Sequence, residues 1–299
     1  MVEPQQQHSS SMIFTTTPGI DGVDLHMRTW PHATANYHLV MVHGVISHGG
    51  WYGSSADRLH AAGCHVDFLD RRGSGLNGWQ RGDVTDWRVW LDDLRCHLTR
   101  VRRRHPDRTI VLAGISWGGK LVCQLAKEHR DLLDRLLLIC PGLFARQFPS
   151  ASKYAALRLI CNAGLGGLHF PIPLKDPALF TDVPKWRKFI AEDSLTLRTV
   201  TARFALADRE LTRTARREPH RIACPTWLAL AGRDRIVENE RTEAYWRSIN
   251  HHDKRIVTYP EAAHTFEFET DPSTYFGHLV SQATRPIEGL DKTTTRVRH

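Results

Sequence analysis

The chain has 299 residues, a formal net charge of +8 and six cysteines. This length suits one large domain, or a core domain with an inserted segment. The cysteines form no C-x-x-C pair and lie mostly in apolar runs, which predicts a reducing compartment without a disulfide framework or a metal site. No apolar run reaches the ~18 residues of a membrane span, and the polar N-terminus lacks the apolar stretch of a secretory signal. We therefore expect a cytoplasmic protein.

Predicted strands and helices alternate along most of the chain. Residues 12–30 read as an edge hairpin that turns at Gly19–Gly22. Further strands are predicted at 37–42, 65–70, 109–113, 135–140, 225–231 and 255–259, and helices near 52–62, 84–104, 117–130, 239–249 and 273–283. This alternation predicts an α/β fold with a mostly parallel twisted sheet and helices on both faces.

The alternation stops between Pro141 and about Cys224. This stretch is too long for a plain loop and is mainly helical in pattern. We interpret residues 142–223 as an inserted helical cap between two parts of an α/β core, residues 12–141 and 224–285. The N-terminal segment 1–11 and the C-terminal tail 286–299 are polar, and we expect disorder in both, beginning near Thr284 in the second.

The most informative motif is the G-x-S-x-G pentapeptide at Gly114–Gly118. A buried strand precedes it and a helix follows it, which is the setting of a nucleophile elbow. Glycines are needed on both sides because the turn is sharp, and the turn leaves the serine hydroxyl at a helix N-terminus. The alternative is an ordinary strand–helix turn. We predict that Ser116 is a nucleophile.

A serine nucleophile needs a general base, and the base needs a carboxylate to orient it. In the elbow fold the acid precedes the histidine in the chain. Asp234 follows the predicted strand 225–231, and His264 follows the strand 255–259. Both therefore reach the strand-end edge where active sites of open α/β sheets lie. A turn aspartate and a surface histidine are the alternatives, but the shared order and placement favour a Ser116–His264–Asp234 triad.

An oxyanion hole needs two backbone N–H donors. One is the N–H of Trp117, which follows the nucleophile. The second is predicted at Val45, in the segment His43–Val45 that follows the strand 37–42, where Gly44 permits a close approach. An ordinary strand-exit turn is the alternative for this segment.

These motifs together resemble the α/β-hydrolase superfamily and, within it, the monoacylglycerol lipase and lysophospholipase group. The matching segments are His43–Val45 with His48 and Tyr52, Asp70–Asn77, the elbow Gly114–Gly119, Gly232–Val237 and Ala263–His264. The resemblance implies that Gly44, His48 and Tyr52 contact the substrate near its alcohol. One position departs from the family pattern, since Ser74 stands where the family usually carries histidine.

Residues 154–170 of the predicted cap are apolar with few charges. They are expected either to line a tunnel for an acyl chain or to form a lid that touches lipid aggregates. The simpler alternative, which we favour, is that they pack on the core.

The resulting hypothesis is a serine esterase that cleaves medium or long acyl monoesters of the monoacylglycerol or lysophospholipid kind without a metal or organic cofactor. An acyltransferase, or a C–C or amide hydrolase, would use the same triad. A catalytically silent fold that binds a ligand or partner is the remaining alternative. The basic clusters Arg100–Arg104 and Arg213–Arg221 accompany no nucleic-acid-binding motif and are interpreted as solvated helix faces, so no nucleic-acid partner is expected.

Overall fold

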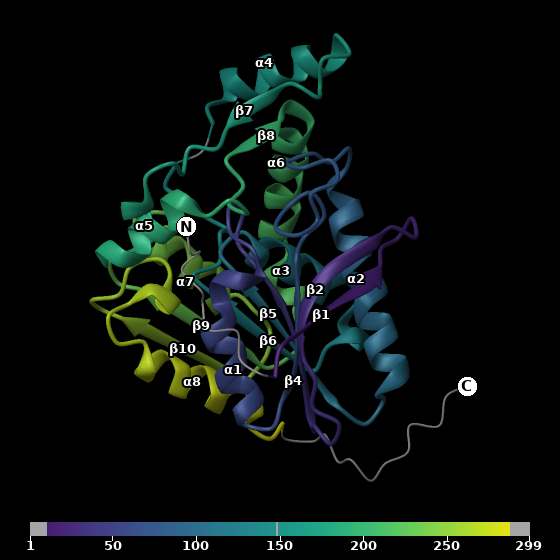
Figure 1. The fold of residues 1–299 in the computed structure, drawn as a ribbon, viewed down its shortest axis with the longest axis vertical. Coiled ribbons are helices and arrows are strands. Elements are labelled where there is room, and N and C mark those ends of the chain that lie inside the picture. Colours follow the sequence, from purple (N-terminus) through teal and green to yellow (C-terminus); the bar gives the residue numbers. More distant parts are fainter. Residues whose placement is uncertain (1–10, 148, 288–299) are drawn as a thin grey trace.

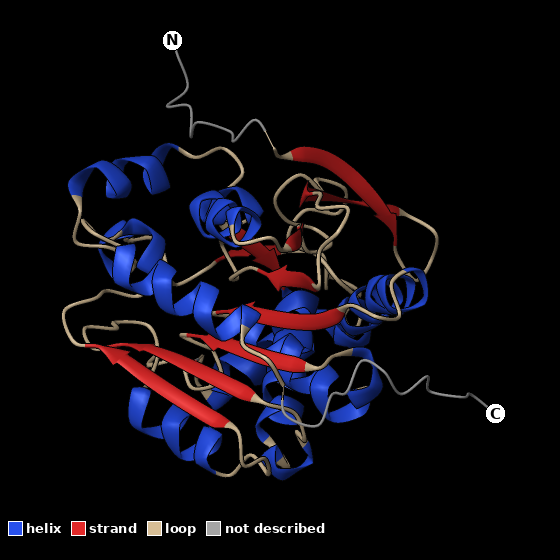
Figure 2. Ribbon diagram, turned by 90° about the horizontal axis from the view of Figure 1, so that it is seen from below, coloured by secondary structure: helices blue, strands red, loops and turns tan. Residues whose placement is uncertain are grey.

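An eight-stranded sheet runs through the molecule in the computed structural model, which describes residues 11–147 and 149–287 (Figures 1 and 2). The strands follow the order β1-β2-β4-β3-β5-β6-β9-β10. Their bounds are β1 Ile13–Pro18, β2 Asp24–Trp30, β3 Tyr37–Val42, β4 His65–Leu69, β5 Thr109–Ile115, β6 Arg135–Ile139, β9 Thr226–Ala231 and β10 Lys254–Tyr259. Strand β2 is antiparallel to β1 and β4, and the other neighbours pair in parallel. The predicted α/β class is confirmed.

Helices cover both faces of this sheet (Figure 2). Helices α1 (Gly53–Ala61) and α8 (Ser273–Thr284) pack on each other and on strands β4 and β3, whereas α2 (Trp87–Arg104) and α3 (Gly118–Glu128) form the layer that contacts β1, β5 and β6. Helix α7 (Asn239–Arg247) follows β9. The central strands are buried on both faces, which is why β3, β5, β6 and β9 read as continuous apolar runs in the sequence.

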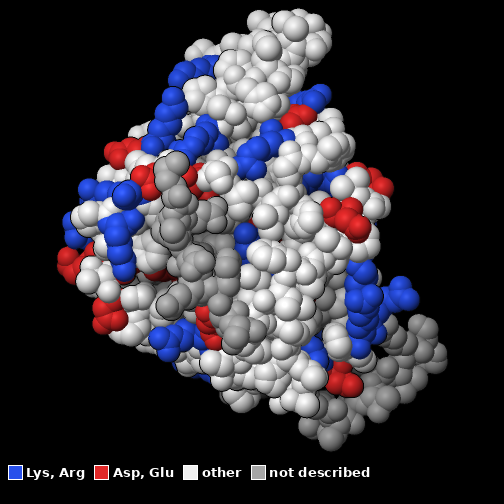
Figure 3. All heavy atoms as spheres, viewed as in Figure 1, with Lys and Arg blue, Asp and Glu red and all other residues white. Residues whose placement is uncertain are grey.

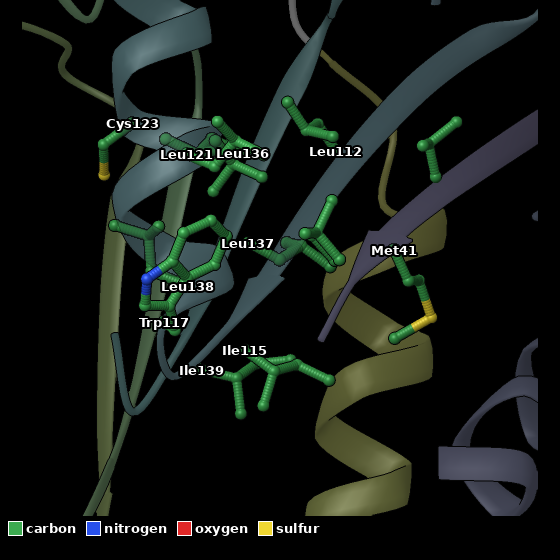
Figure 4. Close-up of a cluster of buried hydrophobic side chains, with 14 of the residues drawn as sticks. Met41, Leu112, Ile115, Trp117, Leu121, Cys123, Leu136, Leu137, Leu138 and Ile139 are labelled. Atoms are coloured by element: carbon green, nitrogen blue, oxygen red, sulfur yellow. The ribbon is translucent and has the colours of Figure 1, made fainter. Parts of the chain in front are cut away.

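The main core lies between the central strands and helix α3 (Figure 4). Leucines of β6 (Leu136 to Leu138) and Leu121 of α3 contribute fully or almost fully buried side chains. Trp117, the residue after the predicted nucleophile, belongs to the same buried cluster. The turn that carries Ser116 is therefore built onto the buried core.

The end of helix α8 differs from the prediction of disorder near the C-terminus. Residues 1–10 and 288–299, most of the segments expected to be disordered, lie outside the described residues. Thr284, however, is the last residue of α8, and Arg285 forms an ion pair with Asp253. The expected onset of disorder near Thr284 is therefore wrong, because this ion pair anchors the end of the helix.

The segment between β6 and β9 leaves the sheet and lies beyond the carboxyl ends of its strands (Figure 1). It contains helices α4 (Ala151–Asn162), α5 (Pro184–Glu192) and α6 (Ala202–Arg216). It also contains β7 (His169–Pro171) and β8 (Thr199–Thr201), which pair antiparallel in a separate small sheet. This sheet was not predicted, because three-residue strands are too short to show a periodic pattern.

Basic and acidic side chains are interspersed over the face shown in Figure 3. In the cluster Arg100–Arg104, Arg102 pairs with Asp134 at 2.7 Å, and in the cluster Arg213–Arg221, Arg213 pairs with Glu210 at 2.8 Å. None of the helices in the described part of the chain is both long enough and apolar enough to cross a bilayer.

Gly118→Ala is predicted to destabilise the protein by roughly 1–3 kcal/mol, the usual cost of overpacking. A Cβ at Gly118 would lie 2.3 Å from the carbonyl oxygen of Val42, and a backbone carbonyl in the sheet cannot yield. The clash opposes the gain of about 1 kcal/mol that alanine normally brings to a helix. Thermal unfolding followed by circular dichroism measures the change.

Gly53→Ala is the matched control for this prediction. Gly53 begins helix α1 with φ −58°, and nothing lies within 4 Å of a Cβ placed there. Its melting temperature should equal or exceed that of the wild type. A Gly118→Ala protein as stable as the Gly53→Ala protein would contradict the packing argument.

Candidate active site

Ser116 occupies the turn between β5 and α3, with a backbone φ of +52°. A positive φ is rare for a residue with a side chain and marks backbone strain, which is often stored at functional sites. The Ser116 N–H donates to the carbonyl of Ile139 at 2.9 Å, and its carbonyl accepts from the N–H of Gly142 at 2.6 Å. The loop after β6 thus holds the strained turn from both sides.

The three residues predicted as a triad meet at the strand-end edge of the sheet. The Ser116 hydroxyl lies 2.9 Å from Nε2 of His264, and Nδ1 of His264 lies 2.8 Å from Oδ2 of Asp234. The three residues come from the loops after β5, β10 and β9, and all are buried. This is the arrangement of a serine nucleophile, a general base and an orienting carboxylate.

Asp234 is held as a carboxylate. Its Oδ1 accepts hydrogen bonds from the N–H groups of Ile236 at 2.7 Å and Val237 at 2.8 Å. Burial raises the pKa of Asp234, but the neighbouring His264 and these backbone donors outweigh burial, and the pKa lies below its usual value. Because Asp234 is ionised, it fixes the His264 tautomer that carries its proton on Nδ1 and leaves Nε2 free to accept the serine proton.

Gly44, which precedes the predicted second oxyanion donor Val45, lies beside the nucleophile. A Cβ at Gly44 would be 3.3 Å from Cβ of Ser116. Nε2 of His43 accepts the N–H of Arg71 at 2.9 Å, so Nδ1 carries the proton and donates to the Gly44 carbonyl at 2.8 Å. Burial keeps His43 neutral and lowers its pKa to about 3. Since a peptide unit is planar and trans, holding the Gly44 carbonyl also fixes the direction of the Val45 N–H.

A cavity of about 530 Å³ extends from Val45 and Trp117, the two predicted oxyanion residues. Its wall is mainly apolar and comes largely from the segment between β6 and β9, including Leu157, Ile160, Phe170, Leu174, Leu179 and Phe204. This volume and lining are typical of a site for a small apolar ligand.

Helix α4 forms part of this wall instead of packing on the core. Ala156, Leu157 and Ile160 line the cavity together with the buried Tyr154, whereas Leu159 is 69% exposed. The expectation that this apolar segment packs on the core is therefore wrong. Its apolar residues have two other environments, the cavity on one side and the protein surface on the other.

Two charged residues in the cavity wall were missed in the sequence. Lys120 of α3 donates to Oδ1 of Asp208 on α6 at 2.7 Å, and the indole N–H of Trp117 donates to the same oxygen at 2.5 Å. Both residues line the cavity. Lys120 stands four positions after Ser116 in the first turn of α3. This spacing is a signal in the sequence that its side chain lies near the nucleophile. Nothing in the sequence pairs it with an aspartate 88 positions away.

Comparison with known proteins agrees with this geometry. Residues 33–271 match the family described as serine aminopeptidase, S33. The chain belongs to the serine aminopeptidase S33 family. The monoglyceride lipase of Mus musculus is a relative, 25% identical over 256 residues that cover 83% of this chain and 82% of the mouse protein.

Solved structures of other proteins share the fold of this S33 family chain. A soluble variant of monoglyceride lipase from Saccharomyces cerevisiae superposes with a TM-score of 0.82 at 17% identity, covering 99% of this chain and 100% of the yeast chain. A monoacylglycerol lipase from Paleococcus ferrophilus gives 0.75 at 22% identity, covering 87% of this chain and 100% of that one. The predicted α/β-hydrolase fold and the resemblance to the monoacylglycerol lipase group are confirmed.

His48 and Tyr52, which the family resemblance assigned to the substrate, make contacts within the protein. Nε2 of His48 lies 3.0 Å from Oδ2 of Asp193, and the Tyr52 hydroxyl lies 3.1 Å from the Ser47 hydroxyl. Neither side chain is part of the cavity wall formed by the described residues. Their role in substrate binding stays a prediction, and the contact of His48 with Asp193 ties the loop after β3 to the inserted segment.

Among the described residues, two groups of side chains have the composition of a metal site. Cys140, Asp234 and His264 form one, but there the histidine and aspartate are already joined as described above. His38, His65 and Asp67 form the other. Nδ1 of His65 accepts the N–H of His32 at 3.3 Å, so its Nε2 carries a proton toward Asp67. We interpret this group as a buried carboxylate that accepts hydrogen bonds from the histidines around it.

The loop that carries His264 is clamped from two directions. The carboxylate of Glu267 accepts the N–H of Ser55 at 2.7 Å and its hydroxyl at 2.5 Å, which joins the loop to α1. The Thr265 N–H donates to the Phe180 carbonyl at 3.0 Å, which joins it to the inserted segment. Burial raises the pKa of Glu267 to about 7.

Glu267→Gln is predicted to reduce the loss of folding stability that the wild type undergoes as the pH rises. In the folded state Glu267 holds its proton up to about pH 7, whereas in the unfolded chain it loses it near its ordinary pKa of 4.5. Folding therefore loses stability as the pH rises from about 4.5 through 7, and the neutral glutamine avoids this loss. Between pH 5 and 8 the melting temperature of the wild type should fall relative to the variant by a few degrees.

Only the difference between the two proteins tests this prediction, because buried histidines titrate in the same range. His43 and His38 have lowered pKa values, so they make the folded state more stable as the pH rises toward 6.5 in both proteins. A difference in melting temperature that does not change with pH would contradict the assignment to Glu267.

Proposed function

We propose that the protein is a serine hydrolase that cleaves carboxylic esters, with monoacylglycerols, lysophospholipids or similar medium-to-long acyl monoesters as substrates. The observation that carries this proposal is the chain of hydrogen bonds from Ser116 through His264 to Asp234 beside an apolar cavity of about 530 Å³. Relatives described as monoglyceride and monoacylglycerol lipases support ester hydrolysis as the reaction class.

The proposed reaction proceeds in two halves. Ser116 Oγ attacks the ester carbonyl while His264 Nε2 accepts its proton, and Asp234 stabilises the resulting imidazolium. The N–H groups of Val45 and Trp117 bind the tetrahedral oxyanion. His264 then donates the proton to the departing alcohol, which leaves an acyl-enzyme on Ser116. Water attacks the acyl-enzyme with His264 again as base, and the carboxylic acid is released.

Amide hydrolysis is the competing use of this triad, since the family description includes aminopeptidases. An aminopeptidase needs a free acceptor for the charged α-amine of its substrate. Among the described residues of the cavity wall, Asp208 is the acidic one, and its charge is already paired with that of Lys120 at 2.7 Å. A mainly apolar wall fits an acyl chain better than a peptide terminus.

The inserted segment is proposed to act as a cap, residues 142–223, that covers Ser116 and supplies the acyl site. Leu159, Leu165 and Leu168 are large apolar side chains exposed on its outer surface. This supports transient contact of the cap with a lipid surface that presents the substrate. The six cysteines are free, which supports the proposed cytoplasmic location.

Ser116→Ala is predicted to abolish reaction with a fluorophosphonate probe and hydrolysis of p-nitrophenyl esters. Asp234→Asn should reduce kcat by roughly 10⁴-fold, because the amide no longer fixes the reactive His264 tautomer. Initial rates on esters from acetate to palmitate, beside probe labelling of each variant, measure both effects. Wild-type protein that is labelled but hydrolyses no ester would favour acyl transfer or another bond type, and wild-type protein that is not labelled would contradict the triad itself.

Ala156→Trp is predicted to shift the preferred acyl chain to shorter esters. Ala156 lines the cavity from α4, so an indole there fills part of the space for the chain. Ala155 is its neighbour on the same helix, is exposed and is not part of the cavity wall, so Ala155→Trp is the matched control. Equal chain-length profiles for the two variants would show that the acyl chain binds elsewhere.

A further inference from the structure

Arg71 contacts both residues of the predicted oxyanion hole, Val45 and Trp117. It follows strand β4 by two positions and is buried, with 3% of its surface exposed. Its Nη2 donates to the carbonyl of Val45 at 2.7 Å. Its Cζ lies 4.5 Å from the centre of the Trp117 ring, within the range of a cation–π contact. One side chain therefore contacts the two residues whose N–H groups would bind the oxyanion.

Contacts to Arg71 and His43 fix Val45 on both of its peptide units. Its N–H belongs to the peptide whose carbonyl, that of Gly44, accepts from Nδ1 of His43. Its own carbonyl accepts from the guanidinium of Arg71. The backbone N–H of Arg71 also donates to Nε2 of His43 and thereby selects the His43 tautomer. Both restraints on the Val45 backbone thus depend on Arg71.

The side chain of Trp117 is equally confined. Trp90 meets it edge to face at 4.9 Å, Arg71 lies over its ring, and its indole N–H donates to Asp208. Trp117 is the first residue of the turn into α3, so a fixed side chain also limits movement of its backbone N–H. The guanidinium of Arg71 touches both Val45 and this tryptophan.

No carboxylate among the described residues forms a hydrogen bond with Arg71, although the nearby Asp208 and Asp70 favour its charged form. Its Nε and Nη1 are buried and have no hydrogen-bond partner among the described residues. The adjacent Arg72 differs, because it bonds to both Asp93 and Asp21. A buried cation without a bonded anion costs free energy, and such a group is useful where negative charge develops during a reaction.

We propose that Arg71 is a positioning residue of the oxyanion hole, which fixes the N–H groups of Val45 and Trp117 and adds its positive charge to the field at the tetrahedral oxyanion. The inference rests on the proposed function, since it assumes that Ser116 attacks an ester carbonyl to form such an intermediate. It adds a residue that touches neither the substrate nor the triad, and whose effect is confined to the transition state.

Arg71→Met and Arg71→Lys test this proposal, with Arg72→Lys as the control at the neighbouring position. The measurements are the second-order rate of fluorophosphonate labelling at Ser116, and kcat and KM on a p-nitrophenyl ester. We expect Arg71→Met to lower kcat and the labelling rate roughly 10- to 100-fold, somewhat less than loss of a whole oxyanion donor. KM should stay within about twofold, because the ground state does not use the hole.

Arg71→Lys should fall between wild type and Arg71→Met. An ammonium group can keep a bond to the Val45 carbonyl and the positive charge, but it cannot stack flat on the Trp117 ring. Arg72→Lys should lower the melting temperature and leave the labelling rate unchanged, since its bonds are to Asp93 and Asp21. A merely structural role of Arg71 would instead make the two lysine variants behave alike.

Three results would overturn the proposal. The first is an Arg71→Met protein that is labelled as fast as the wild type. The second is an Arg71→Met protein whose KM rises while its kcat equals that of the wild type. The third applies if Arg71→Met does not fold, and is an Arg71→Lys protein whose kcat equals that of the wild type. In each case the wild type is still labelled at Ser116, so the proposed function survives. A wild type that is not labelled would overturn both.

Discussion

The active-site geometry depends on one crowded contact, the approach of the elbow turn to strand β3. Gly118 lies so close to the Val42 carbonyl that a single methyl group would not fit, and Ser116 accepts a positive φ on the other side of the same turn. The nucleophile is placed by backbone packing in the core and not by its own side-chain contacts. Rigid core strands provide the support that such strain requires.

The other parts of the site are arranged around this fixed point. His264 and Asp234 arrive on loops from β10 and β9, and hydrogen bonds to backbone N–H groups hold the carboxylate in place. The loop after β3 brings Gly44 against Ser116, while His43 and Arg71 restrain the peptide units on either side of Val45. Each catalytic element is thus oriented by hydrogen bonds among buried groups, and the Val45 peptide also by the buried charge of Arg71.

The sequence predicted those parts of the molecule whose signals are local. Buried parallel strands read as apolar runs, and a glycine-framed serine between a strand and a helix indicates an elbow whatever surrounds it. Asp234 and His264 could be predicted because each follows such a strand. Lys120–Asp208 and the contacts of Arg71 could not, since they join side chains from distant elements and leave no periodic or spacing pattern. The environment of α4 was also misjudged, because an apolar helix has the same pattern whether it faces a core, a cavity or the surface.

Helix α4 adds no side chain to the main apolar core, although it forms part of the cavity wall. Its packing partner in the fold is α6, and the sheet does not rely on it. Substitutions along α4 therefore alter the shape of the cavity at small cost in folding free energy, whereas the strands and the elbow tolerate almost no change. The residues that shape the cavity and the residues that stabilise the fold thus lie in different segments of the chain. New specificities can arise by changing one peripheral helix while the catalytic residues stay unaltered.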